Sequence, residues 1–101
     1  MTRAIVHEGD VAGNVVSFER DGKREVGYWL GGEFWGKEIA TRALAEFLRE
    51  VTQRPLYATV ATSNVGSIRV LEKCGFRIVR RAMYFDERIG EQIEEALLEL
   101  P

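Results

Sequence analysis

Several features are scarce or missing in this chain of 101 residues, and each absence excludes a class of protein. Cys74 is the only cysteine, so no intrachain disulfide can form, which fits the reducing cytoplasm. The first residues lack the apolar stretch of a signal peptide, and no run of about 18 apolar residues could span a membrane. A net charge of −2 gives no sign of a nucleic-acid surface. We expect a cytoplasmic protein without nucleic-acid or membrane partners.

The remaining composition is typical of a globular domain, with 46% apolar and 30% charged residues. A chain of this length can bury roughly 60–70% of its unfolded surface, which is enough for one modest core. The sequence therefore predicts a single domain over residues 1–101.

Strand patterns dominate the first third of the chain. Residues 11–20 and 24–30 are rich in valine and aromatic residues and flank Asp21-Gly22-Lys23, which favours a tight hairpin turn. Residues 4–7 form a shorter apolar segment before another turn signal, Glu8-Gly9-Asp10. We expect a short strand there, followed by the hairpin.

Helix and strand patterns alternate in the middle of the chain. Residues 36–51 carry one apolar stripe at helical spacing, and residues 56–60 resemble a buried strand. Asn64 then suits the N-cap of a second helix, and Gly75 suits its left-handed end. This strand–helix–strand order predicts two near-parallel strands with a crossover helix.

Glycine and polar residues follow the strand 24–30, in the stretch Trp35-Gly36-Lys37-Glu38-Ile39-Ala40-Thr41. A helix that begins here presents unpaired backbone N–H groups and about half a positive charge, which together favour an anion such as a phosphate. The alternative is an ordinary connection between a strand and a helix, because one or two glycines are common there.

Two motifs at fixed spacing carry a family resemblance. Glu25-Val26-Gly27-Tyr28-Trp29 precedes the loop just described, and Asn64, Ser67, Lys73, Gly75 and Phe76 follow further along the chain. In this order the motifs resemble the GNAT superfamily of acetyl-CoA-dependent N-acetyltransferases. Within it, they are most similar to the branch that acetylates the N-termini of ribosomal proteins.

The resemblance implies an α/β fold, with two main helices on a twisted mixed sheet. It also implies that residues 77 to 101 form a hairpin of two long strands, with Arg88-Ile89-Gly90 near its turn. Helix propensity alone disagrees, because Glu91 to Leu100 contains mostly helix-forming residues. We follow the resemblance here.

The resemblance further implies acetyl-CoA as co-substrate and an amine or a peptide N-terminus as acceptor. Its diphosphate would lie against the loop amides, its pantetheine arm against the strand 24–30, and its distal part near the second helix. The implied cofactor-binding residues are Trp29, Leu30, Trp35, Gly36, Lys37, Glu38, Ile39, Ala40, Thr41, Asn64, Ser67 and Lys73. No metal is implied.

Two residues are candidates for proton transfer. Glu25 is the candidate base, because a carboxylate on this strand serves some relatives; the alternative is a surface glutamate beside Arg24. Tyr84 is the candidate for protonating the leaving thiolate, although its spacing from Gly75 matches the family only weakly.

The chain departs from the family in two respects. Glu38 stands where the family has glycine, and we expect its bulk and charge to weaken phosphate binding while it stabilises the helix start in the empty protein. Glu38 could instead point to solvent or pair with Arg42. The segment before Glu25 is also shorter than in full members, so apolar surface should be exposed and a homodimer is expected. A degenerate acyl-CoA-binding module and a chain completed by another subunit are the alternatives.

Overall fold

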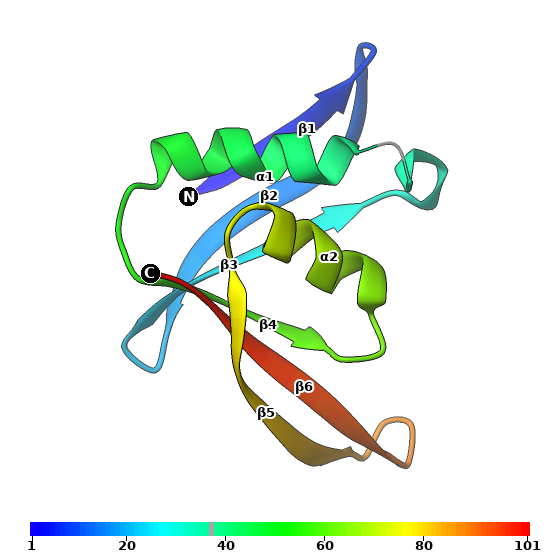
Figure 1. Ribbon diagram of the computed structural model, residues 1–101. Helices are drawn as coiled ribbons and strands as arrows, with labels where there is room; N and C mark the ends of the chain where they lie inside the picture. Colours follow the sequence, from blue (N-terminus) through cyan, green and yellow to red (C-terminus); the bar gives the residue numbers. More distant parts are fainter. Residues whose placement is uncertain (37) are drawn as a thin grey trace.

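The computed structural model describes residues 1–36 and 38–101, and within these residues it contains one six-stranded sheet and two α-helices (Figure 1). The strands are β1 (Thr2–His7), β2 (Asp10–Arg20), β3 (Lys23–Leu30), β4 (Leu56–Ala61), β5 (Arg77–Asp86) and β6 (Glu91–Leu100). The helices are α1 (Ile39–Glu50), α2 (Val65–Lys73) and the short 3₁₀ helix η1 (Gly32–Phe34).

The sheet is mixed, in the order β1-β2-β3-β4-β6-β5. β3 and β4 run parallel, whereas each of the other neighbouring pairs is antiparallel. The expected α/β class is confirmed, and so are the predicted parallel strands. The parallel connection needs a crossover, which α1 provides.

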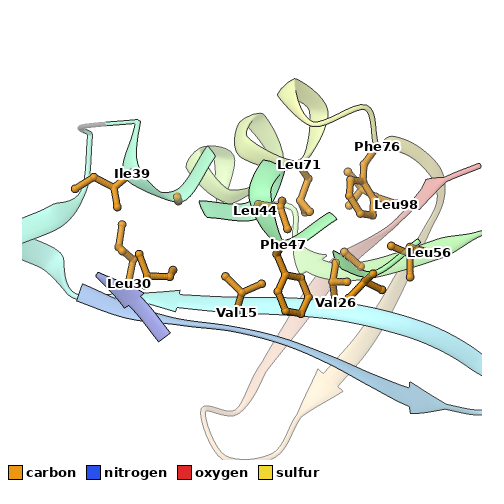
Figure 2. Packing of buried hydrophobic residues seen from close by; sticks show 14 of the residues in the cluster. Val15, Val26, Leu30, Ile39, Leu44, Phe47, Leu56, Leu71, Phe76 and Leu98 are labelled. Atoms are coloured by element: carbon orange, nitrogen blue, oxygen red, sulfur yellow. The ribbon is translucent and has the colours of Figure 1, made fainter. Parts of the chain in front are cut away.

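Both helices cover the same face of the sheet, and the core lies between them and the strands (Figure 2). The predicted apolar stripe of α1 is its buried face, with Leu44 and Phe47 at 0% and 2% exposure. Leu56, Leu71 and Leu98 bring β4, α2 and β6 into the same core. The hydrophobic contacts therefore join both halves of the sheet.

The turn between β2 and β3 forms as the sequence predicts. Asp21 and Gly22 have φ values of 52° and 78°, as a two-residue turn of this kind requires. The turn aligns Arg20 with Lys23 and sets the register of both strands. This register later decides the partner of Glu25.

Residues 91–100 form a strand, as the resemblance implies and against their helix propensity. β6 is paired on both sides, with β4 and β5, and its Ala96 and Leu98 are fully buried. Sheet pairing and burial outweigh propensity, which is a weak local preference.

The start of α1 is a correction to the sequence-based expectation. The helix begins at Ile39 rather than near Gly36, because Glu38 and Gly36 have left-handed φ values of 61° and 76°.

The second helix, α2, ends as expected. Gly75 has a φ of 98°, and its N–H donates a hydrogen bond to the Glu72 carbonyl oxygen at 3.0 Å. The Phe76 N–H donates a second one to the Leu71 carbonyl oxygen, also at 3.0 Å.

Candidate functional site

The parallel strands β3 and β4 separate toward their carboxyl ends. They are paired at Glu25 and Tyr57, near their amino ends, and diverge beyond this point. The connection to α1 leaves the end of β3, and three residues separate the end of β4 from the start of α2. A crevice at the carboxyl ends of parallel strands is a common ligand site in α/β proteins.

Three adjoining cavities follow this crevice. The outer cavity, about 320 Å³, lies at the start of α1; the middle cavity, about 580 Å³, lies between β3 and the start of α2; and the inner cavity, about 250 Å³, lies between β3 and β4. The outer and middle cavities share Leu30, Gly36, Ala40, Gly66 and Val70. The middle and inner cavities share Tyr28, Asn64 and Ser67. The shared lining residues place the three cavities side by side along the crevice.

The start of α1 forms one wall of the outer cavity. Glu38, Ile39, Ala40 and Thr41 all line it, so the first amides of the helix lie at this end of the crevice. The Ile39 and Ala40 side chains are buried at 5% and 9% exposure, which anchors the helix start to the core. Lys37, also expected here, lies outside the described residues.

The Glu38 side chain is 61% exposed, and its carboxylate pairs with Lys73 rather than with Arg42, the partner considered from the sequence. Its Oε1 lies 2.7 Å from Lys73 Nζ on α2, across the outer cavity. The hydrogen bond from Lys73 lowers the pKa of the Glu38 carboxyl below its ordinary value. The expectation that Glu38 stabilises the start of α1 is wrong in part. With φ at 61°, Glu38 lies before the first helical residue, so its higher helix propensity relative to glycine adds no stability there.

The start of α2 forms the opposite wall of the crevice. Asn64 caps the helix, as predicted, with its Oδ1 accepting a hydrogen bond from the Ser67 N–H at 3.1 Å. The Ser67 hydroxyl is 2.9 Å from the Tyr28 hydroxyl on β3. Burial raises the pKa of Tyr28, so its phenol stays neutral at physiological pH.

Backbone groups of β3 also face the crevice. The Gly31 N–H bonds Ala12 O on β2 at 2.9 Å, so the alternation of the ladder turns the N–H groups of Tyr28 and Leu30 toward β4. The Leu30 carbonyl accepts a 2.8 Å hydrogen bond from Trp35 Nε1, which holds the loop against the strand end. Leu30 thus offers a backbone donor at the junction of the outer and middle cavities.

Comparison with known proteins agrees with this architecture. Residues 2–77 match the model of the acetyltransferase (GNAT) domain, which is more than half of the chain. This chain belongs to the GNAT acetyltransferase family. No protein in the curated set matches it.

Solved structures share the fold of this GNAT chain. The ribosomal-protein-alanine N-acetyltransferase of Brucella melitensis is 20% identical with a TM-score of 0.83, over 97% of this chain and 66% of its own length. The protein yncA of Salmonella typhimurium, solved with its cofactor acetyl-CoA, is 18% identical with a TM-score of 0.84, over 98% and 62%. A GNAT acetyltransferase of Bacillus anthracis is 22% identical with a TM-score of 0.76, over 93% and 60%. The chain thus spans between 60% and 66% of the length of these structures.

Most of the sequence-predicted cofactor residues of the GNAT chain meet at this crevice. They come from the end of β3, the loop before α1, the first turn of α1, and α2. Those that line the three cavities are Trp29, Leu30, Trp35, Gly36, Glu38, Ile39, Ala40, Thr41, Asn64, Ser67 and Lys73. Cys74, at the end of α2, is partly buried, and burial raises the pKa of its thiol.

The two candidates for proton transfer, Glu25 and Tyr84, do not line the three cavities. Tyr84 is on β5, an edge strand two positions from β4, and the structure does not bring it to the cavities described above. Glu25 lies on the face of β3 opposite to Val26 and the helices. It is 6% exposed, so the alternative of a surface glutamate beside Arg24 is wrong.

The partners of Glu25 were missed from the sequence. Arg20 donates two hydrogen bonds to its carboxylate, at 2.9 and 2.8 Å, and the Thr59 hydroxyl donates a third at 3.3 Å. Thr59 also lines the inner cavity, so Glu25 lies just behind that wall. The Asp21-Gly22 turn was the available signal, because it places Arg20 diagonally across from Glu25.

Two general features complete the description. Over residues 1–36 and 38–101, neither helix has the length and apolar character needed to cross a membrane. In that same part of the chain, three or more His, Cys, Asp or Glu side chains nowhere gather closely enough to share a metal ion.

Proposed function

We propose that this GNAT chain binds acetyl-CoA along the crevice and transfers the acetyl group to an amine. The observation that carries the proposal is the row of adjoining cavities from the first turn of α1 to the gap between β3 and β4. One end offers helix amides and a lysine for phosphate, and the other reaches the gap between β3 and β4, where the thioester would lie.

Each part of the ligand has a partner in this arrangement. The diphosphate would meet the amides of Ile39, Ala40 and Thr41 and, once Glu38 releases it, the ammonium of Lys73. The pantetheine arm would follow the middle cavity, with the Leu30 N–H on one side and Asn64 on the other. The bound thioester would then point toward the inner cavity, where its carbonyl needs a donor as charge develops on oxygen.

The proposed reaction is a direct transfer. The nitrogen of the acceptor amine attacks the thioester carbonyl carbon, the carbon–sulfur bond breaks, and the amide forms. Glu25 is the proposed acceptor of the amine proton, supported by its position behind Thr59 at the inner cavity. Because Arg20 bonds both carboxylate oxygens, proton transfer to Glu25 requires one of these bonds to open. Tyr84 as donor of a proton to the thiolate stays a prediction.

The acceptor we propose is a peptide N-terminus. The sequence motifs support this choice over a small amine, and the chain shares its fold with the ribosomal-protein-alanine N-acetyltransferase of Brucella melitensis. A panel of short peptides with free and blocked N-termini, with a small primary amine for comparison, separates the two acceptor classes.

An acyl-CoA-binding module without turnover is the second candidate. Two observations favour it: Glu38 holds Lys73 at the phosphate end, and Arg20 holds the candidate base. Binding of acetyl-CoA without turnover of any amine would support this candidate over the enzyme.

We also propose that the chain forms a homodimer through the β1 edge. β1 is an edge strand of the sheet, and Val6 on it pairs with Val11, both of them exposed, at 61% and 72%. Sedimentation velocity should show a dimer at micromolar concentration that Val6→Lys dissociates. Val79→Lys, at an exposed position on the other edge strand, is the matched control. A monomeric wild-type chain would overturn the proposal.

The test of the main proposal combines calorimetry with NMR. We expect acetyl-CoA and CoA to bind and to shift the amide resonances of Ile39, Ala40 and Thr41 most strongly. Shifts confined to other regions, or no binding, would exclude this cofactor site. Turnover that disappears in Glu25→Gln while binding persists would support the proposed base.

A further inference from the structure

A hydrogen bond crosses the crevice at the point where the middle and inner cavities meet. The hydroxyl groups of Tyr28 on β3 and Ser67 on α2 are 2.9 Å apart, and both residues line both cavities. A ligand that extends from the middle cavity into the inner one must therefore pass this pair.

Part of the wall beyond the pair is apolar. The inner cavity has a volume of about 250 Å³, and Val26, Ala58, Val60 and Leu71 are among the residues that line it. Ligand methylene groups that leave water to contact these side chains contribute favourable free energy to binding. An acetyl group is too short to use this space, whereas a longer acyl chain could fill it.

The Tyr28 side chain is held in place from both sides. Ser67 lies in the first turn of α2, where its own N–H is bound to the Asn64 cap. On the other side, Tyr28 packs against the buried core. The ring is thus a fixed part of the crevice wall rather than a mobile surface side chain.

We propose that Tyr28, positioned by Ser67, limits the acyl group of the bound thioester to a short chain by closing the inner cavity. The inference rests on the proposed acyl-CoA site and adds its acyl-chain selectivity. Tyr28 acts here as a specificity-determining residue and takes no part in the proton transfers.

The test compares acetyl-CoA with hexanoyl-CoA by calorimetry, using CoA alone as the reference ligand. The wild-type chain should bind acetyl-CoA more tightly than hexanoyl-CoA by about tenfold or more, because the longer chain finds no room. Tyr28→Ala should abolish or reverse this ratio by opening the inner cavity. Tyr57→Ala, which removes a tyrosine outside the three cavities, is the matched control and should keep the wild-type ratio.

Two milder variants cover the case in which Tyr28→Ala does not fold. Tyr28→Phe and Ser67→Ala each remove one partner of the hydrogen bond and leave a side chain of similar size, so each should shift the ratio in the same direction by a smaller factor. The ratio is the readout, since Ser67 also belongs to the proposed cofactor site.

The outcomes separate this inference from the function on which it rests. If CoA binds but the wild-type chain shows no preference for acetyl-CoA, or the folded variants keep the wild-type ratio, the acyl-length inference is overturned and the cofactor site stands. If CoA and both thioesters fail to bind the wild-type chain, both are overturned.

Discussion

Lys73 at the end of α2 donates a 2.7 Å hydrogen bond to Glu38 at the start of α1. The pair joins the two helices across the outer cavity. The Glu38 carboxylate thereby occupies the Lys73 ammonium, which a bound phosphate would contact. Any phosphate that enters must either displace the Glu38 carboxylate from Lys73 or bind close to its negative charge. Glu38, which stands where the family has glycine, thus occupies the lysine at the phosphate end of the crevice.

Replacing Glu38 with glycine should raise the affinity for CoA. The change frees Lys73 and removes a like charge, and we expect a gain of roughly two- to tenfold that shrinks as salt increases. The melting temperature should hold or rise, because glycine adopts the φ of 61° at this position without strain. Calorimetry at low and high salt measures the first effect, and Glu46→Gln, elsewhere on α1, is the control. Unchanged affinity would show that the ion pair does not oppose binding.

Removing Arg20 should destabilise the fold more than its own exposure suggests. Arg20→Ala leaves the buried Glu25 carboxylate without its main partner, and we expect a loss of about 1–3 kcal/mol, moderated because the Arg20 side chain is 54% exposed. The double variant with Glu25→Gln should recover much of the loss. Urea unfolding of the single and double variants gives the coupling free energy. Additive effects would contradict a coupled pair.

Adding a single methyl group at Gly13 should disrupt the sheet. A Cβ atom there would lie 1.9 Å from the Trp29 carbonyl oxygen, a clash with backbone that a side-chain rotation cannot relieve. We expect Gly13→Ala to cost more than about 3 kcal/mol or to prevent folding. Gly66→Ala on α2 meets nothing within 4 Å and should instead raise stability by up to about 1 kcal/mol. Thermal unfolding of both variants tests the contrast.

The turn between β5 and β6 should loosen in acid. Asp86 accepts hydrogen bonds from the backbone and side chain of Arg88, and these bonds hold the pKa of its carboxyl below the ordinary value of 3.8. A carboxyl with a lowered pKa contributes stability that is present above its unfolded pKa and is lost as pH falls through its folded pKa. NMR of the Arg88 amide should therefore show a transition below about pH 4. Asp86→Asn should remove that transition, and its persistence there would exclude Asp86 as the cause.

Local sequence determined most of the secondary structure and the outer part of the site. The Asp21-Gly22 turn, the stripe of α1, the Asn64 cap and the left-handed Gly75 depend on residues close together in the chain, so their patterns are readable without a fold. The loop before α1 and the start of α2 were predicted for the same reason. These two segments lie at the same end of the sheet because β3 and β4 are parallel, as the alternation of strand and helix patterns predicted.

The tertiary structure alone decided the contacts between distant segments. Residues 91–100 became a strand because β4 and β5 pair with them, and propensity carries no information about partners. Lys73 and Tyr28 reach their partners across 35 and 39 positions of sequence, and Thr59 reaches Glu25 across 34. Such contacts depend on how elements pack, which single-residue preferences do not encode. The sequence therefore predicted an anion site at the start of α1, and the packing decided that Glu38 pairs with Lys73 there and where the neighbouring cavities lie.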